Sequence, residues 1–390
     1  MPEPLVSFVI PCYNLAHLLE QCVFSILAQT FTDYEVLIMD DCSPDNTAEV
    51  VKSFQDSRIR HVRNEHNLGH LRNYNKGICF SRGKYVWLIS ADDCLRRPYV
   101  LKRYVELMER NPSVGYTFCP AVGVRYGCET AVLQYSQYSD RDRVVNGRHF
   151  LRDLLHHNIV VAASALARRE CYQKLSLFPL NVVWAGAPVE MGWVGDWYLW
   201  CLFALSYDVG YFAEPMVRYR EHELSMTNTL TRKETVANCS AADIAMFWLV
   251  RQRATELGLR ETSKQCLAAV AQEYARQFMC KPYAQAASAM SLAEIEESLR
   301  RSTPSECERQ LVRARLWASI GDKMCFKGDW RSARQYYFKS LRRDLRLVSV
   351  YVKVVLSYLG TVGVDIRRRL NSARRKITNS SLVKHQRNSL

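Results

Sequence analysis

Short apolar runs alternate with segments of helical spacing through the first 93 residues of the chain. Residues 5–10 (LVSFVI), 35–39 (EVLIM) and 84–90 (KYVWLIS) are rich in β-branched and aromatic residues, and Pro or Asp follows each run within two residues. From Leu15 to Leu27, apolar side chains recur as on one face of a helix. This alternation predicts a mainly parallel α/β sheet with helices on both faces.

Polar residues follow three of these expected strands, at 11–14, 40–43 and 90–93. Ligands of parallel sheets bind beyond the carboxyl ends of the strands, so we expect the three clusters to line one pocket. The chain has neither a G-x-G-x-x-G nor a Walker A motif, which argues against dinucleotide-binding and P-loop proteins.

Adjacent carboxylates stand in two of these clusters. Asp92 and Asp93 repel each other unless a positive group lies beside them, and Mg²⁺ or Mn²⁺ with substrate phosphates is a common solution. The alternative is that Asp92 caps the next helix while Asp93 is solvated. Asp41, with Asp40, could hydrogen-bond a base or a ribose. Alternatively, Asp41 or Ser43 caps the next helix.

Five segments in this order resemble the motifs of family 2 glycosyltransferases with the GT-A fold. The resemblance covers roughly residues 4–228, and it implies an inverting, nucleotide-sugar-dependent enzyme with a Rossmann-like mixed sheet. The segments are FVIPCYN (8–14), EVLIMDDCSPDNT (35–47), NLGHLRNYNKGI (67–78), GKYVWLISADD (83–93) and GDW (195–197).

The resemblance implies a donor nucleotide site. Pro11 and Tyr13 match residues that line the base pocket, and the Tyr ring stacks on the base. Asp41 matches the carboxylate that reads the base, usually uracil. Arg72 and Asn73 match an Arg-Asn pair near the nucleotide, and together these residues favour a UDP-sugar donor.

The resemblance also implies a divalent cation, Mn²⁺ or Mg²⁺, and a catalytic base. Asp92 and Asp93 match the carboxylates that contact the ribose and the metal. His222 matches a residue that completes the metal or pyrophosphate site. Asp196 matches the base that deprotonates the acceptor hydroxyl.

Two positions depart from the family pattern. Ser90 stands where the first Asp of the usual D-x-D-D is expected, and Gly195 stands where an acidic residue usually precedes the base. Three Trp residues surround that base in sequence. Trp193 and Trp197 could provide an apolar wall beside the base, and the alternative for these two is core packing. Trp184 and Trp193 could instead stack on an acceptor sugar.

The chain changes character near residue 230, after a last strand expected at 210–219. Pro and Gly become rare, and helical spacing continues to about 343. One part of this region matches the spacing of a single tetratricopeptide-like helix pair. We expect a GT-A catalytic domain (1–230), a helical domain (231–345), and a basic amphipathic helix with a disordered tail (346–390).

The last fifty residues carry most of the formal net charge of +14. They contain twelve Lys or Arg and two Asp, which gives +10. Apolar residues recur from Leu341 to Ile366 at alternating steps of four and three, with Arg on both sides. This pattern favours a helix, within 341–376, that lies on an anionic membrane surface. The alternative is a helix packed on the preceding helices, and the absence of aromatic residues after Tyr358 argues against specific nucleic-acid binding.

The expected protein is a cytoplasmic enzyme, peripheral on the inner face of the membrane. It would transfer a sugar to a glycan or lipid-linked acceptor during surface polysaccharide synthesis. The chain start lacks the pattern of a signal peptide, and the cysteines are scattered. The helical region could instead hold a protein partner or a second copy. The alternatives to an active enzyme are an inactive nucleotide-sugar-binding protein and a helical scaffold.

Overall fold

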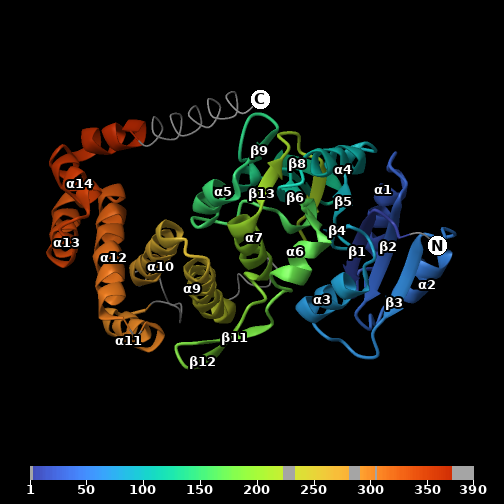
Figure 1. The fold of residues 1–390 in the computed structure, drawn as a ribbon, viewed down its shortest axis with the longest axis horizontal. Helices are drawn as coiled ribbons and strands as arrows, with labels where there is room; N and C mark the ends of the chain where they lie inside the picture. Colours follow the sequence, from blue (N-terminus) through green and yellow to red (C-terminus); the bar gives the residue numbers. More distant parts are fainter. Residues whose placement is uncertain (1–2, 223–232, 281–289, 304, 371–390) are drawn as a thin grey trace. The chain divides into compact units, whose positions relative to one another are not determined.

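The computed structural model describes residues 3–222, 233–280, 290–303 and 305–370. The chain forms two compact units, Met1–Cys266 and Leu267–Leu390. Within the described part of the first unit, the central sheet has eight strands in the order β3-β2-β1-β4-β10-β6-β13-β9 (Figure 1). In that order the strands are Ile59–Arg63, Tyr34–Asp40, Val6–Cys12, Tyr85–Leu88, Leu166–Arg168, Val114–Phe118, Asp208–Tyr211 and Arg143–Val145.

The central sheet is mixed, which confirms the predicted α/β fold class. Strands β3, β2, β1 and β4 are parallel, whereas β10 is antiparallel to both of its neighbours. The apolar runs at 5–10, 35–39 and 84–90 supply β1, β2 and β4.

The prediction of a single strand at 210–219 is wrong, because two strands occupy this region and belong to different sheets. Strand β13 pairs with β6, but β14 (Val217–Arg220) pairs with β7 in a second sheet. Pro215 lies between them and has no N–H to continue a ladder. The second sheet has the order β5-β14-β7-β8, and its other strands are Cys94–Leu95, Ala121–Arg125 and Cys128–Val132.

Helices cover both faces of the central sheet. Apolar side chains of α1 and α4 share a core with Phe8 of β1. On the other face, α3 approaches β1 so closely that a Cβ on Gly77 would lie 2.4 Å from Val9 Cγ1. Successive strand residues point to opposite faces, so Phe8 faces the layer of α1 and α4 and Val9 faces the layer of α3. The helices are α1 (Ala16–Leu27), α2 (Thr47–Ser53), α3 (His70–Phe80), α4 (Val100–Arg110), α5 (Gly147–Leu154), α6 (Arg169–Lys174) and α7 (Gly195–Ser206).

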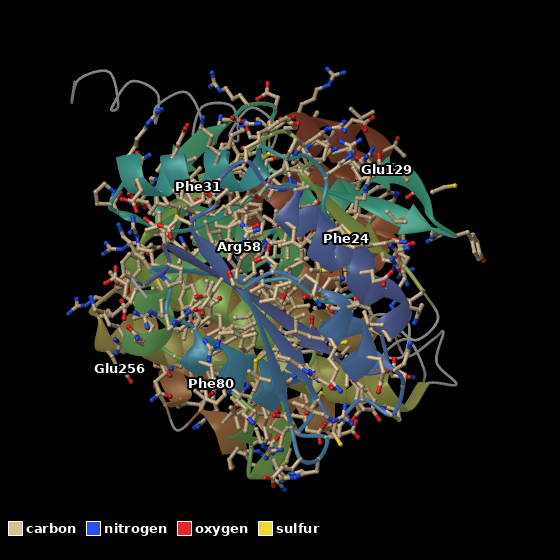
Figure 2. All side chains as sticks on the ribbon, turned by 90° about the vertical axis from the view of Figure 1, so that its right-hand side faces the viewer. Phe24, Phe31, Arg58, Phe80, Glu129 and Glu256 are labelled. Atoms are coloured by element: carbon tan, nitrogen blue, oxygen red, sulfur yellow. The ribbon has the colours of Figure 1, made fainter. Side chains whose placement is uncertain are left out.

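Surface side chains of the first unit show where this core ends. Phe24 lies on the outer side of α1, 56% exposed (Figure 2). Glu129 of β8 forms ion pairs of 2.8 Å with both Arg96 and Arg218, which tie together the strands of the second sheet (Figure 2).

The first unit extends past residue 230, where the sequence analysis placed the change of domain. Helix α9 (Lys233–Glu256) packs on α7 and on a hairpin formed by β11 (Asn181–Trp184) and β12 (Ala187–Glu190). The Trp248 ring of α9 stacks on Trp184, with 5.6 Å between ring centroids.

The described part of the second unit is helical, as predicted for the C-terminal region. Helices α12 (Glu306–Phe326) and α13 (Trp330–Arg343) form a closely packed pair. Gly321 makes this approach possible, because a Cβ there would lie 2.6 Å from the Tyr337 ring. The other helices are α10 (Arg260–Cys280), which begins in the first unit, α11 (Leu292–Ser302) and α14 (Val348–Tyr358).

The apolar stripe predicted from Leu341 to Ile366 does not form one continuous helix. Leu341 belongs to α13 and is buried in the core of the second unit. Helix α14 ends at Tyr358, and Gly360 adopts a positive φ of 54° before the chain continues as a helix to residue 370. The expected disordered tail lies outside the described residues, apart from its beginning.

Helix α14 exposes one apolar side to solvent, and its other side packs on the protein through Val350 and Val354. Val348 and Val355 are 72% and 63% exposed. Lys353 instead donates to the Asp322 carboxylate of α12 at 2.8 Å. Among the described helices, none has the length and apolar character needed to span a membrane.

Candidate active site

The carboxyl ends of β1, β2 and β4 meet at one edge of the central sheet. Backbone hydrogen bonds extend this edge beyond the strands: Asp41 N–H donates to Cys12 O at 2.9 Å, and Ala91 N–H donates to Pro11 O at 3.3 Å. Pro11 is buried within β1, whereas Tyr13 is 49% exposed. The Tyr13 ring is therefore available for stacking at this edge.

Asp40 and Asp41 have different partners. The buried Asp40 carboxylate accepts hydrogen bonds from Arg63 Nη1 at 2.6 Å and from Ser43 N–H at 2.8 Å. These contacts fix the turn after β2. Asp40 thus has a structural role, and the interpretation in which it contacts a base or ribose has no support from this geometry.

The Asp41 carboxylate holds the loop that leads into α3. It accepts hydrogen bonds from Leu68 N–H at 2.8 Å, Gly69 N–H at 3.0 Å and Asn64 Nδ2 at 2.8 Å. Gly69 has φ of 83°, a backbone conformation that favours glycine. Asp41 therefore connects the end of β2 to the start of α3.

The Arg72-Asn73 pair is divided between surface and interior. Asn73 is buried, donates to Met39 O at 2.8 Å and accepts from Asn64 Nδ2 at 3.0 Å. Arg72 is exposed. Of the two, Arg72 has the side chain that a ligand could reach, while Asn73 fixes α3 against β2.

The two carboxylates after β4 have separate environments. Asp92 Oδ2 lies 2.9 Å from His222 Nε2, and Asp92 Oδ1 is buried without a hydrogen-bond partner among the described residues. Burial raises the pKa of Asp92, but hydrogen bonds from His222 and Ser90 outweigh it, so the pKa lies below its ordinary value.

Asp93 is buried, and its Oδ1 accepts a hydrogen bond from Arg220 N–H at 3.0 Å. Burial and the neighbouring charge of Asp92 raise the pKa of Asp93 well above its usual range. A divalent cation would oppose both effects. The unpartnered Asp92 Oδ1 is an oxygen of the kind that a hard cation such as Mg²⁺ or Mn²⁺ prefers, although no three His, Cys, Asp or Glu side chains are grouped as metal ligands among the described residues. We expected His222 to share a metal with Asp93. In the structure His222 contacts Asp92 instead.

Asp196 stands in the first turn of α7. Its Oδ1 accepts from Trp197 N–H at 2.7 Å and its Oδ2 accepts from Asn158 Nδ2 at 3.1 Å. Burial raises the pKa of Asp196 to about 6, although these hydrogen bonds oppose the shift. A carboxylate of this pKa is largely ionised at neutral pH and is a stronger base than an ordinary surface Asp.

Gly195 explains one departure from the family pattern. A Cβ at this position would lie 3.1 Å from Phe178 and 3.2 Å from Leu71. The site therefore has little room for the acidic side chain that usually precedes the base.

The three predicted acceptor-site Trp residues lie in different surroundings. Trp193 is 39% exposed. Trp197 Nε1 donates to Leu154 O at 2.8 Å, and its ring packs edge-on against Phe247. Trp184 stacks on α9, as described above. Trp193 is therefore the member with a largely available ring.

Sequence reasoning missed two residues that the fold brings to this site. Tyr74 of α3 lies within electrostatic reach of Asp92, Asp93 and Asp196, and burial together with these carboxylates raises its pKa. Asn158 contacts Asp196 from the segment after α5. Tyr74 lies within the segment 67–78, to which the resemblance assigns roles only for Arg72 and Asn73, and Asn158 lies outside the five segments, so the fold is what links both residues to this site.

Known proteins were compared with this chain. Residues 7–176 match the family model described as glycosyl transferase family 2. Glycosyltransferase GlyG of Streptococcus pneumoniae is 33% identical over 112 residues, which cover 28% of this chain and 37% of that protein. The UDP-Glc:alpha-D-GlcNAc-diphosphoundecaprenol beta-1,3-glucosyltransferase WfgD of Escherichia coli is 36% identical over 93 residues, 24% of this chain and 37% of that protein. The chain thus spans less than half the length of these relatives.

The fold is similar to that of a solved structure. Residues 1–349 of S. aureus TarS, in complex with UDP-GlcNAc, align with 87% of this chain and 91% of theirs. The TM-score is 0.56 and the sequence identity is 14%. This likeness confirms the GT-A arrangement of the fold.

Proposed function

Residues 7–176 form a family 2 glycosyltransferase domain, and from this premise we propose that the protein is an inverting glycosyltransferase. It moves a sugar from a nucleoside diphosphate donor to a hydroxyl group of an acceptor. One observation carries the proposal. Asp92, Asp93 and Asp196 all act electrostatically on Tyr74, which supports one site that contains the donor carboxylates and a base of raised pKa.

The proposed reaction uses Asp196 as general base. Asp196 takes the proton from the acceptor hydroxyl as that oxygen forms a bond to the anomeric carbon. The bond from that carbon to the diphosphate oxygen breaks on the opposite face, and the nucleoside diphosphate leaves with the electron pair. The configuration at the anomeric carbon is therefore inverted.

The proposed donor is a UDP-sugar. Tyr13 supplies an exposed ring for the base, Asp41 supplies carboxylate oxygens, and Arg72 supplies an accessible cation for the phosphates. Pro11 and Asn73 would shape this site from buried positions. WfgD, whose name specifies UDP-Glc, supports this donor class.

Asp93 and His222, with Asp92 toward the ribose, would hold a divalent cation, Mn²⁺ or Mg²⁺. When bound, such a cation supplies charge neutralisation at the leaving diphosphate. The buried, unpartnered Asp92 Oδ1 and the raised pKa of Asp93 support this assignment.

The proposed acceptor is a glycan or a lipid-linked glycan in surface polysaccharide synthesis. The diphosphoundecaprenol acceptor in the name of WfgD supports this class. Trp193 would stack on an acceptor sugar, with Trp184 and Trp197 forming the wall behind it.

We further propose that the enzyme works on the cytoplasmic face of a membrane, with residues 341–376 on an anionic lipid surface. Val348 and Val355 expose apolar surface on α14, and the exposed Arg346 and Arg368 precede and follow this helix along the chain. Apolar surface beside cations complements an anionic bilayer. In this proposal residues 1–230 carry the catalytic function, within the compact unit that extends to Cys266.

The test is a calorimetric titration of UDP with Mn²⁺, beside GDP, dTDP and CDP, for the wild type and for Asp93→Ala. We expect metal-dependent UDP binding that Asp93→Ala abolishes, followed by turnover of a UDP-sugar. Tight binding of another nucleotide would overturn the donor assignment. If no nucleotide binds with any metal, the protein is not this enzyme and the scaffold interpretation takes its place.

A further inference from the structure

The Asp196 carboxylate has a side-chain partner whose orientation is fixed. Asn158 Oδ1 accepts a hydrogen bond from Val160 N–H at 3.2 Å. An amide oxygen accepts and an amide nitrogen donates, so this contact directs the nitrogen toward Asp196. The nitrogen lies 3.1 Å from Asp196 Oδ2, and the opposite amide orientation would lose both hydrogen bonds.

A second donor lies one helical turn beyond Asp196. Trp200 occupies the i+4 position of α7, which places it on the same side of the helix. Its Nε1 is buried and has no hydrogen-bond partner among the described residues. The ring is held against Tyr116, with centroids 5.0 Å apart, and the Tyr116 hydroxyl donates to Trp200 O at 3.3 Å.

A buried donor without a partner is costly unless something accepts from it. Asp196 is the nearby acceptor, and the influence of Trp200 on Asp196 favours its ionised form. The N-terminal position of Asp196 on α7 adds the positive end of the helix dipole. Burial is the largest effect and raises the pKa of Asp196, and these donors limit that rise.

We propose that Asn158 is a positioning residue that fixes the direction and the charge state of the Asp196 carboxylate, with Trp200 as a supporting donor. The inference rests on the proposed function and explains how a partly buried base stays competent. Without Asn158, the carboxylate would keep the Trp197 N–H but lose the contact that directs Oδ2.

Other titratable groups beside Asp196 stay neutral in the working range. Tyr74 from α3, Tyr135 from the turn at Gln134–Ser136 and Cys201 from α7 all interact with Asp196. Burial raises the pKa of each. On α5, Asp153 acts on Tyr138 and His149. Asp93 also has a pKa well above its usual range, so the acid limb is assigned to Asp196 by its response to substitution of Asn158 and not by its position alone.

The test is the pH profile of kcat/KM for Asn158→Asp and Asn158→Ala in the full chain. Asn158→Asp places a like charge beside Asp196, so the acid limb moves up by at least about one pH unit. The loss of activity is then at least about tenfold larger at pH 6 than at pH 8.5. Asn158→Ala moves the limb in the same direction by less.

Asn146→Asp is the matched control. Asn146 Nδ2 also donates to an Asp, Asp208 Oδ1, at 3.3 Å, but away from the proposed base. This variant keeps the wild-type profile. An equal loss at every pH in Asn158→Asp, or an unmoved acid limb, would overturn the inference.

A second measurement separates this inference from the proposed function. NMR of Asp labelled with ¹³C at the carboxyl carbon, assigned with Asp196→Asn, gives the Asp196 titration without any substrate. A higher midpoint in Asn158→Asp supports the inference even if no sugar donor is turned over. An unchanged midpoint refutes it even if the wild type is an active transferase.

Discussion

Arg367 binds Asp322 through both guanidinium nitrogens, with two N···O distances of 2.8 Å. Lys353 Nζ and the Tyr337 hydroxyl lie at the same distance from this carboxylate. Asp322 therefore holds α14 and the helix after Gly360 against α12 and α13. Breaking one member of such a group leaves the remaining charges without a partner.

Asp322→Asn should destabilise the second unit by about 2 kcal/mol, a value reduced for the partial exposure of the cluster. Hydrogen exchange in α12 and α14, followed by mass spectrometry in urea, measures this loss. Asp365→Asn is the control, because Asp365 and Arg368 form a highly exposed pair and should contribute close to nothing. Equal effects of both variants would contradict the assignment.

The same cluster predicts an acid-sensitive contact. Burial raises the pKa of Asp322, but Lys353 and Arg367 outweigh burial and bring the pKa below its ordinary value. A carboxyl with a depressed folded pKa stabilises the fold above its unfolded pKa and loses this effect as pH falls through the folded pKa. Hydrogen-exchange protection of α14 should thus be constant from pH 7 to about 5 and decline below about 4. Asp322→Asn should remove this decline.

Gly77→Ala should destabilise the first unit by about 1–3 kcal/mol, because the new methyl group would overlap Val9 Cγ1. Urea unfolding followed by tryptophan fluorescence measures the change. Val9→Ala removes the overlapping atom, so the double variant should be less destabilised than the sum of the two single variants. Strict additivity would show that the close approach of α3 to β1 is not the cause.

Asp196→Asn should reduce kcat by at least about 100-fold, since an amide cannot accept the acceptor's proton. Calorimetry should show UDP binding unchanged. In the wild type, kcat/KM should fall below an apparent pKa of about 6, because a protonated Asp196 is no longer a base. A profile without an acid limb near that value would argue against Asp196 as the base.

Val355→Asp should weaken binding to phosphatidylglycerol vesicles by about tenfold, the effect of removing about 1.5 kcal/mol of apolar contact. Sedimentation with vesicles measures this change. Vesicles of phosphatidylcholine alone should bind the wild type and the variants weakly. Val183→Asp is the control and should leave vesicle binding unchanged, because Val183 is likewise an exposed apolar residue, 81% exposed, on the β11–β12 hairpin and not on α14. If Val355→Asp leaves vesicle binding unchanged but breaks a dimer, the exposed face of α14 binds a second copy instead.

The sequence predicted the central sheet because β1, β2 and β4 are mainly apolar, as expected for strands that are buried along their whole length. It could not predict the change of sheet near Pro215, since pairing partners β6 and β7 lie about a hundred residues earlier. Strand pairing depends on these distant segments, and the local pattern of apolar residues does not indicate which strands pair.

The sequence predicted the site residues that belong to a motif. It could not predict which of two adjacent residues is buried and which is exposed, because that depends on the fold. The Arg72-Asn73 pair does not reveal which member is buried, because Asn73 is fixed by Met39 O and Asn64. Likewise, the apolar stripe favoured a membrane-surface helix but did not reveal which side of α14 packs on the protein. The orientation is instead set by Asp322, whose attraction for Lys353 depends on the packing of α12.

The contacts of Asp41 have a consequence for the energetics of donor capture. Its carboxylate already secures Leu68 and Gly69, so the loop into α3 is ordered before any ligand arrives. The entropy of arranging that loop is lost when the chain folds and does not reduce affinity later. Donor binding at this edge should accordingly show a small heat-capacity change, set by the surface it covers and without a contribution from coupled folding.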